Sequence, residues 1–385
     1  MRFEYATSGR ILFGPGTISE VPALAASLGK KALIVTDSLD RSSILREGLL
    51  AAGVSVEFFL VRKEPDLVSI LLATRNIKEF GCRLVIGFGG GAALDTGKAA
   101  AALTENPGDP LDYLEVVGLG HPLLNPSLPF IAIPTTAGTG SEVTRNAVVS
   151  LPDKQIKVSL RSPYMLPRHA IVDPELTYSL PPSITAWTGL DALTQLIEPF
   201  VCNSPNPLID AVCRDGIVRA ARSLRKACEI GQDVEARQDM SLASLFGGLA
   251  LANARLGAVH GMANPIGGSS RAQHGAVCAR LLPFVVETNL LALRARLPAS
   301  PAIPRYAEVA RLLTGDENAS PEAAVDWLRN LCASLEIQPL KEFGLNPDDF
   351  PALVEQSQKA SSMKGNPLLL TNDELLSILG RAYSG

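Results

Sequence analysis

The chain has 385 residues, more than a single hydrophobic core usually serves, so two domains are expected. Hydrophobic residues make up 46% and charged residues 19% of the chain, so much of it must be buried. The net charge of −4 gives no electrostatic reason to expect binding to nucleic acid or to an anionic membrane.

The first half of the chain alternates short apolar runs with stretches of helical periodicity. The apolar runs, which predict strands, lie at 11–16, 31–37, 54–61, 83–91 and 128–136, and helical stretches cover 67–80 and 92–103. Strands that alternate with helices at this spacing are typical of a doubly wound α/β domain.

After about Asp173 the pattern changes to helical periodicity alone. The predicted helices cover 183–202, 206–227, 234–254, 276–293, 304–313 and 321–335, with Pro and Gly between them. We therefore predict an α/β N-terminal domain, doubly wound and Rossmann-like, over residues 1–180. An all-α C-terminal domain is predicted over residues 181–385.

Six cysteines, at positions 82, 202, 213, 228, 278 and 332, are scattered without a CxxC pair. This spacing argues against a disulfide framework and against a cysteine zinc site. We expect reduced, largely buried thiols in a cytoplasmic protein. No uncharged apolar run reaches the roughly 18 residues of a transmembrane helix. The early Glu4 and the lack of an apolar h-region argue against a secretory signal.

A glycine-rich stretch, GFGGGAALDTGK, follows the predicted strand at 83–91. Its three consecutive glycines allow a sharp turn and a close approach of the backbone to a ligand. The helix that begins near Ala92 would direct free N–H groups and its positive dipole end at a pyrophosphate. The spacing matches neither G-x-G-x-x-G nor a Walker A motif, and such a turn can also be purely structural.

A second loop, PTTAGTGSEVT, also follows a predicted strand and is dense in Gly, Ser and Thr. Two such loops at strand ends favour nucleotide binding. Asp37 ends the strand at 31–37, where a carboxylate accepts hydrogen bonds from an adenosine ribose and repels a 2′-phosphate, favouring NAD over NADP. The alternative for Asp37 is a solvated turn. The candidate NAD-binding residues are Asp37, Gly89, Gly90, Gly91, Asp95, Lys98, Thr135, Thr136, Thr139 and Ser141.

Two of the four histidines, His260 and His274, lie in one stretch, VHGMANPIGGSSRAQH, with a break predicted at its Gly-Gly pair. A histidine pair at this distance is a weak signal of a metal site. Asp191 and Gln195 are spaced i and i+4, so both could reach one ion from the same face of a helix.

Longer motifs occur in order along nearly the whole chain. They are FGPG, GGGAALDTGKA, PTTAGTGSEVT, DPELTYSLPPSITAWTGLDALTQLIE, VHGMANPIGG followed by AQHGAVCARLLP, and SSMKGNP. On these motifs the chain resembles the iron-containing (group III) alcohol dehydrogenase family. The resemblance implies a dehydroquinate synthase-like architecture, with the active site in the cleft between a nucleotide domain and a helical domain.

The resemblance also implies that four side chains hold a catalytic divalent metal. Matched by motif, the first is Asp191, and the third and fourth are His260 and His274. The second is usually a histidine, but here it is Gln195, and a further histidine common in the family is here Asn264. Two histidines and one carboxylate suffice for Fe²⁺ or Zn²⁺. Because an amide oxygen is a weaker donor than imidazole, we expect a weakly bound metal.

The predicted activity is NAD-dependent interconversion of an alcohol and an aldehyde or ketone by metal-assisted hydride transfer. The predicted catalytic residues are Asp191, His260 and His274. With no histidine at position 264, a water or a cofactor ribose hydroxyl would carry the proton. The expected partners are a small alcohol or aldehyde and further copies of the chain, as a homodimer or higher homo-oligomer. No nucleic acid or membrane is expected as a partner.

Two alternatives remain open. In a metal-independent reductase of a keto or unsaturated acid, resembling maleylacetate reductases, His260 and His274 would donate hydrogen bonds to the substrate. That reaction needs a cationic anchor, for which Arg145 and Lys157 are candidates. The other alternative is a non-catalytic member that binds NAD, its metal site having decayed.

Overall fold

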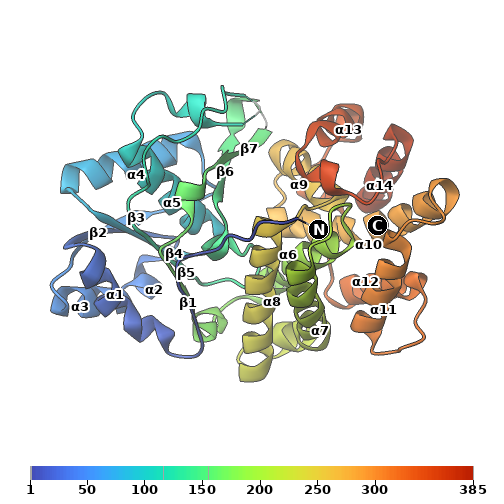
Figure 1. Ribbon diagram of the computed structural model, residues 1–385, viewed down its shortest axis with the longest axis horizontal. Helices are drawn as coiled ribbons and strands as arrows, with labels where there is room; N and C mark the ends of the chain where they lie inside the picture. Colours follow the sequence, from blue (N-terminus) through green and yellow to red (C-terminus); the bar gives the residue numbers. More distant parts are fainter. Residues whose placement is uncertain (1, 116, 155, 385) are drawn as a thin grey trace. The chain divides into compact units, whose positions relative to one another are not determined.

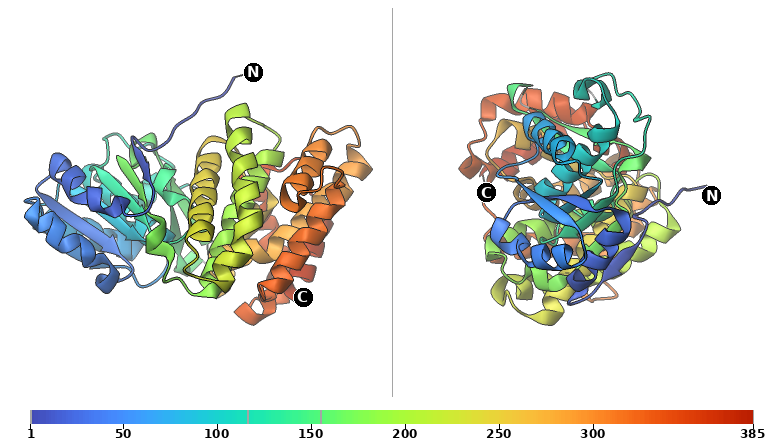
Figure 2. Two further views of the ribbon diagram at one scale, coloured as in Figure 1. Left: turned by 90° about the horizontal axis from the view of Figure 1, so that it is seen from below. Right: turned by 90° about the vertical axis from the view of Figure 1, so that its left-hand side faces the viewer.

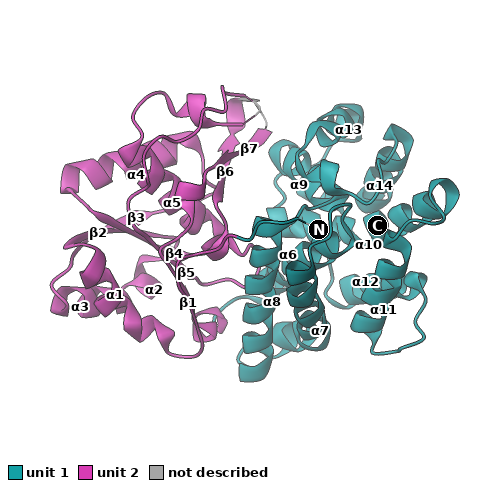
Figure 3. Ribbon diagram, viewed as in Figure 1, with its two compact units in different colours: residues 1–5, 179–385 teal, residues 6–178 magenta. Residues whose placement is uncertain are grey.

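The computed structural model describes residues 2–115, 117–154 and 156–384 (Figure 1). The chain divides into two compact units (Figure 3). Ala6–Tyr178 form the N-terminal unit, and Ser179–Gly385 together with Met1–Tyr5 form the C-terminal unit. The predicted α/β first part and all-helical second part are both confirmed.

The N-terminal unit is built on a six-stranded parallel sheet. In spatial order its strands are β1 (Ile11–Phe13), β8 (His169–Val172), β5 (Phe130–Pro134), β4 (Leu84–Gly89), β2 (Lys31–Thr36) and β3 (Ser55–Leu60). Its helices are α1 (Val21–Leu28), α2 (Leu39–Ser42), α3 (Ile44–Ala51), α4 (Leu67–Phe80) and α5 (Gly91–Glu105).

Strand β2 explains why helices cover both faces of this sheet. Its side chains Ala32 and Ile34 join a core cluster with α1 and α3. The alternate residues Leu33 and Val35 join another cluster with α4 and α5 on the opposite face (Figure 1). A parallel strand buried on both sides needs a continuous apolar run, which is why KALIVT was recognisable in the sequence.

Helix α5 packs closely on the sheet because glycines remove side chains from the contact. A Cβ atom placed on Gly97 would lie 2.8 Å from the Phe130 ring, and one on Gly87 would lie 2.6 Å from it. The missing side chains let α5 start directly after β4, with its N-terminus at the carboxyl end of the sheet.

An antiparallel hairpin, β6 (Asn146–Leu151) and β7 (Ile156–Arg161), was not predicted. Residues of β6 alternate between buried and partly buried, the period-2 pattern of a half-buried strand. Ala147 and Val149 pack in one core cluster with Ala99 and Leu103 of α5. The hairpin therefore lies beside the helix that follows the glycine-rich turn.

The C-terminal unit is all helical in the part of the chain that the structure describes. Its α-helices are α6 (Pro182–Val201), α7 (Pro207–Glu229), α8 (Val234–Asn253), α9 (Ala258–Ser269), α10 (His274–Arg296), α11 (Ala302–Thr314), α12 (Pro321–Ser334), α13 (Phe350–Lys359) and α14 (Asn372–Ser384). Helix α6 packs against α7, α8 and α10. Figure 2 shows the helices of this unit, coloured from yellow-green to red, from two further sides. Helices α9, α13 and α14 were not predicted.

The break expected at the Gly-Gly pair between the two histidines is wrong. Helix α9 continues through Gly267 and Gly268 to Ser269, and the chain leaves helical conformation only over residues 270–273. His260 and His274 therefore lie near the starts of two separate helices, α9 and α10.

Among the described helices, α10 alone is by itself long and apolar enough to cross a membrane. Of its most apolar window, 78% is buried within the protein, as in the core helix of a globular domain. Helices α8 and α9 pass the same test only as a pair and meet at 97°. The expected buried thiols are confirmed, because all six cysteines are buried and none of them forms a disulfide within the described part of the chain.

Candidate metal centre and dinucleotide site

The glycine-rich turn lies where the strand order of the sheet reverses. Strand β2 is followed outward by β3 on one side, while β4 and then β5 lie on its other side. In open α/β sheets ligands bind at such a switch point, outside the carboxyl ends of the strands. Asp37 follows β2 there and Gly90 follows β4, and the Gly90 N–H donates to Asp37 Oδ2 at 2.9 Å.

The second loop meets the glycine-rich turn at the same edge of the sheet. A Cβ atom on Gly90 would lie 3.3 Å from Thr136 Cγ2, and one on Gly91 would lie 2.8 Å from Thr139 Cγ2. Both threonines and both glycines are partly exposed. The structure thus brings Asp37 and the exposed parts of both predicted loops together.

The other predicted cofactor residues lie behind the exposed parts of these loops, where they form hydrogen bonds to the loop backbone or are buried. Lys98 is 1% exposed, and its Nζ donates to the backbone oxygens of Ser141 and Asn146 at 2.8 and 2.7 Å. The Asp95 carboxylate accepts from Ser141 Oγ and from the Val148 N–H. Thr135, Gly89 and Ser141 are buried as well. These residues fix the shape of the second loop from within.

Glu142, in the same loop, makes the stability of this unit depend on pH. Burial raises its pKa to about 7 against the opposing effects of a backbone hydrogen bond and Lys98. The folded state therefore favours the protonated carboxyl. The contribution of Glu142 to the free energy of unfolding falls as the pH rises from about 4.5 to about 7, because the charged form is disfavoured in the folded protein. The free energy of unfolding of Glu142→Gln, relative to the native protein, should be higher at pH 8 than at pH 5. Denaturant titrations at both pH values measure this difference, and an equal difference at both would contradict the assignment.

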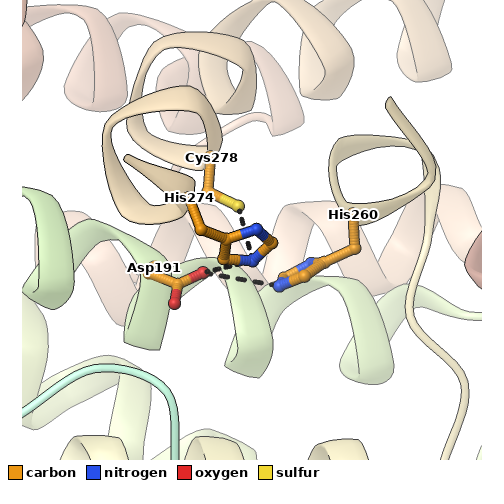
Figure 4. A group of neighbouring side chains, drawn as sticks. All are labelled: Asp191, His260, His274 and Cys278. Carbon is orange, nitrogen blue, oxygen red and sulfur yellow. Dashed lines mark hydrogen bonds and ion pairs between the residues drawn. The ribbon is translucent and has the colours of Figure 1, made fainter. Parts of the chain in front are cut away.

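In the C-terminal unit, three helices bring four potential metal ligands together (Figure 4). Asp191 lies on α6, His260 on α9, and His274 and Cys278 lie one turn apart on α10. One donor atom from each side chain lies within 4.8 Å of all the others. The predicted Asp191, His260 and His274 thus converge, although they are far apart in the sequence.

The donor atoms suit a divalent ion. Asp191 Oδ1 lies 3.4 Å from His260 Nε2 and 3.8 Å from His274 Nε2. At ordinary zinc bond lengths, nitrogen and oxygen ligands of a tetrahedral ion lie about 3.4 Å apart. Asp191 Oδ1 and His260 Nε2 are buried and have no hydrogen-bond partner among the described residues. Buried polar atoms rarely stay unpaired, so a cation between them would satisfy both.

Glu198 orients His260, and the sequence reasoning missed it. Its Oε2 accepts from His260 Nδ1 at 2.7 Å, and its Oε1 accepts from the Val259 N–H at 2.6 Å. A Cβ atom on Gly257 would lie 2.8 Å from Oε1, so glycine is needed where the carboxylate reaches the start of α9. A carboxylate behind a ligand histidine fixes the tautomer that presents Nε2 to a metal. The sequence did contain one indication of this role, because Glu198 follows Asp191 by two helical turns and so lies on the same face of α6.

We predict that Glu198→Gln lowers the affinity for the metal about 10- to 100-fold, the usual cost of losing such a carboxylate. Competition against a chelator of known affinity measures the change. Glu308→Gln is a suitable control, because Glu308 pairs with Arg214 away from the four ligands. Equal metal affinity in Glu198→Gln and the native protein would show that Glu198 does not support His260.

Gln195 and Asn264, the two departures from the family pattern, lie beside the same group. The amide nitrogen of Gln195 donates to Asp191 Oδ2 at 3.1 Å. A Cβ atom on Gly247 of α8 would lie 3.4 Å from Gln195 Oε1, so the amide oxygen lies against α8. Asn264 is one turn after His260 on α9 and only partly buried. Gln195 thus holds the carboxylate that faces the two histidines.

The charges of these groups favour a cation between them. Burial would lower the pKa of His260, but the attraction of Asp191 and Glu198 outweighs it and raises the pKa to about 10. Burial would raise the pKa of Asp191, but its interactions with His260 and His274 lower it. Without a metal, the histidine proton serves as the positive charge beside Asp191. A divalent ion would displace that proton.

Comparisons with known proteins agree with this arrangement. The sequence matches two family models, "Iron-containing alcohol dehydrogenase" over residues 8–174 and "Fe-containing alcohol dehydrogenase family, C-terminal" over residues 185–383. Alcohol dehydrogenase 4 of Saccharomyces cerevisiae is 35% identical over 378 residues, covering 96% of each chain. The 1,3-propanediol dehydrogenase of Klebsiella pneumoniae is 33% identical over 99% of each chain.

Solved structures show the same fold over the full length. A 1,3-propanediol oxidoreductase superimposes with a TM-score of 0.92 at 32% identity, covering 100% of both chains. Sulfoacetaldehyde reductase from Bifidobacterium kashiwanohense, solved in complex with NAD+, gives a TM-score of 0.85 at 30% identity. That comparison covers 100% of this chain and 99% of the reductase.

Proposed function

This chain is an oxidoreductase of the iron-containing alcohol dehydrogenase family, and on that premise we propose that it is an NAD-dependent dehydrogenase that interconverts an alcohol with an aldehyde or ketone. The observation that carries the proposal is the convergence of Asp191, His260 and His274. Asp191 Oδ1 and His260 Nε2 face one another, and neither atom has a hydrogen-bond partner among the residues that the structure describes. Such a set fits Fe²⁺ or Zn²⁺.

When bound, the ion would supply Lewis acidity at the substrate oxygen, and the dinucleotide would supply or accept the hydride. Asp191 contributes a negative charge at the centre of the ligand group, and Gln195 holds its other oxygen. Glu198 keeps Nδ1 of His260 engaged, so that Nε2 faces Asp191. The side chain of His274 is 29% exposed, the most open of the three, so substrate would approach from its side.

For the dinucleotide, we propose direct contacts from the partly exposed Gly90, Gly91, Thr136 and Thr139, with Asp37 at the adenosine ribose. The first-turn N–H groups of α5 project beyond its N-terminus, where a pyrophosphate would bind. The buried Lys98 and the partly buried Asp95 support the second loop rather than contact the cofactor directly.

The proton released from the alcohol needs a path that does not depend on a histidine at position 264. The buried Oδ1 of Asn264 has no hydrogen-bond partner among the residues that the structure describes. An amide oxygen accepts hydrogen bonds but does not take up a proton near neutral pH. We therefore propose that Asn264 positions a water or a cofactor ribose hydroxyl, which carries the proton.

The metal-independent reductase of a keto or unsaturated acid is less well supported. Of its two candidate anchors, Lys157 has a buried side chain that forms an ion pair with Glu64, so its charge is already compensated. Arg145 also takes part in an interaction within the protein. The retained metal ligands favour the alcohol reaction instead.

The test is an activity comparison on one preparation, divided into chelator-treated protein and protein reloaded anaerobically with Fe²⁺ or Zn²⁺. We expect NADH formation from short primary alcohols and diols only in the reloaded portion. Reduction of keto acids by the metal-free portion, with no alcohol oxidation in either, would establish the alternative reaction. NAD binding without turnover of any of these substrates would identify a non-catalytic member.

We further propose a cytoplasmic homodimer or higher homo-oligomer. The six buried cysteines, none of which is in a disulfide among the described residues, support a reducing compartment. Size-exclusion chromatography with light scattering would measure the number of chains in the assembly.

A further inference from the structure

We propose that Cys278 is the fourth ligand of the metal, taking the place of the histidine that Gln195 replaces. The inference rests on the proposed metal site and adds a ligand to it. Cys278 lies one turn after His274 on α10, so both side chains project from the same face of that helix (Figure 4). It is fully buried, and its sulfur is one of the four converging donor atoms.

The position of the sulfur agrees with shared coordination. Cys278 Sγ lies 3.6 Å from His274 Nε2. In a tetrahedral zinc site, with Zn–S near 2.3 Å and Zn–N near 2.05 Å, a sulfur and a nitrogen ligand lie about 3.6 Å apart. The two distances from Asp191 to the histidines are close to the corresponding value for nitrogen and oxygen ligands. The sulfur thus completes a set of carboxylate, two imidazoles and one thiolate.

Gln195 is the competing candidate for the fourth position, and its contacts weigh against it. Its amide nitrogen, which cannot coordinate a cation, is the end that faces Asp191. Its oxygen lies against Gly247 of α8. Coordination through that oxygen would require the amide to turn over and give up its hydrogen bond to Asp191. Cys278 needs no such rearrangement.

A thiolate ligand changes which ion the site prefers. Carboxylate and imidazole bind Fe²⁺ and Zn²⁺ alike, whereas a thiolate is a soft ligand that favours Zn²⁺. It also adds a negative charge, which a neutral amide at position 195 cannot supply. We therefore infer that this chain selects zinc over ferrous iron. Asp191, His260, His274 and Cys278 would together hold the ion, which would supply Lewis acidity at the substrate oxygen.

The experiment uses Co²⁺ as a spectroscopic probe in the full-length protein. Cobalt bound to a thiolate gives an intense sulfur-to-metal charge-transfer absorption in the near ultraviolet, which nitrogen and oxygen ligands do not give. The charge-transfer band should appear in the native protein and in Gln195→Ala. It should disappear in Cys278→Ser, which nearly keeps the side-chain volume, while the visible cobalt bands persist. Cys332→Ser, at another buried cysteine of the same unit, should keep the charge-transfer band.

Zinc affinity gives a second readout that is independent of turnover. Cys278→Ser should lose about 100-fold or more in zinc affinity, because even a residue behind a ligand costs 10- to 100-fold. Stoichiometric cobalt with visible bands but no charge-transfer band in the native protein would overturn the inference and leave the proposed function intact. A charge-transfer band that persists in Cys278→Ser would overturn it too. If the native protein binds neither cobalt nor zinc, both the inference and the proposed metal site fail.

Discussion

Asp191→Asn should leave a folded protein that retains almost no catalytic metal and oxidises alcohols about 10³-fold more slowly. Asparagine matches the shape of Asp191 and can still accept the hydrogen bond from Gln195. It removes the negative charge at the centre of the ligand group, where Oδ1 faces both histidines. Lewis-acid stabilisation of the transition state is worth several kcal/mol, and each 1.36 kcal/mol corresponds to about tenfold in rate.

The matched control for this prediction is Asp239→Asn. Asp239 is another buried carboxylate of the C-terminal unit, held by Arg219, Arg222 and Ser223. Its loss should lower the thermal midpoint without changing the rate per bound metal. If Asp191→Asn keeps both full metal content and the native kcat, Asp191 is not a ligand.

Gly90→Val should weaken NAD binding about 100-fold or more while leaving the metal content unchanged. The Gly90 backbone conformation, with φ −73°, is open to any residue, so the turn itself can form. A Cβ atom there would lie 3.3 Å from Thr136, and the two methyl groups of valine would occupy the space between the two loops. Losing two hydrogen bonds from the backbone to a charged pyrophosphate costs about 3 kcal/mol or more, which corresponds to at least 100-fold.

NADH fluorescence titration measures this affinity, and metal analysis of the same sample shows whether the C-terminal unit is intact. Gly380→Val serves as the control, because a Cβ atom at Gly380 meets no other atom within 4 Å. If a folded Gly90→Val protein bound NADH with native affinity, the glycine-rich turn would not be part of the cofactor site.

Much of the fold was predictable because burial leaves periodic patterns in the sequence. The central strands of the sheet are covered on both faces and read as short apolar runs, and the long helices of the C-terminal unit repeat apolar residues at helical spacing. The hairpin at 146–161 was missed because its weak alternation resembles a continuing loop. The helix through Gly267 and Gly268 was missed because packing there overrides the low helix propensity of glycine.

The candidate site was predictable only in part. Motifs identified Asp191, His260 and His274, and the structure brings them together. Glu198 and Cys278 belong to no separate motif, since their importance depends on how α6, α9 and α10 pack. The scattered cysteine spacing argued against a cysteine zinc site. That argument considers only thiols near one another in the sequence, so it could not detect a single cysteine that joins histidines and a carboxylate through helix packing. Lys98 and Asp95 were expected to contact the cofactor, but in the structure they form hydrogen bonds to the second loop and the strand that follows it.

The most direct test of metal-dependent alcohol oxidation is a titration of metal-free protein with Zn²⁺ or Fe²⁺ under anaerobic conditions. Bound metal per chain, measured by mass spectrometry, is compared at each point with the rate of NADH formation from one alcohol. The rate should rise in proportion to bound metal and reach its maximum at about one ion per chain, the capacity of a single ligand set. A full rate in metal-free protein, or a rate independent of occupancy, would contradict the account.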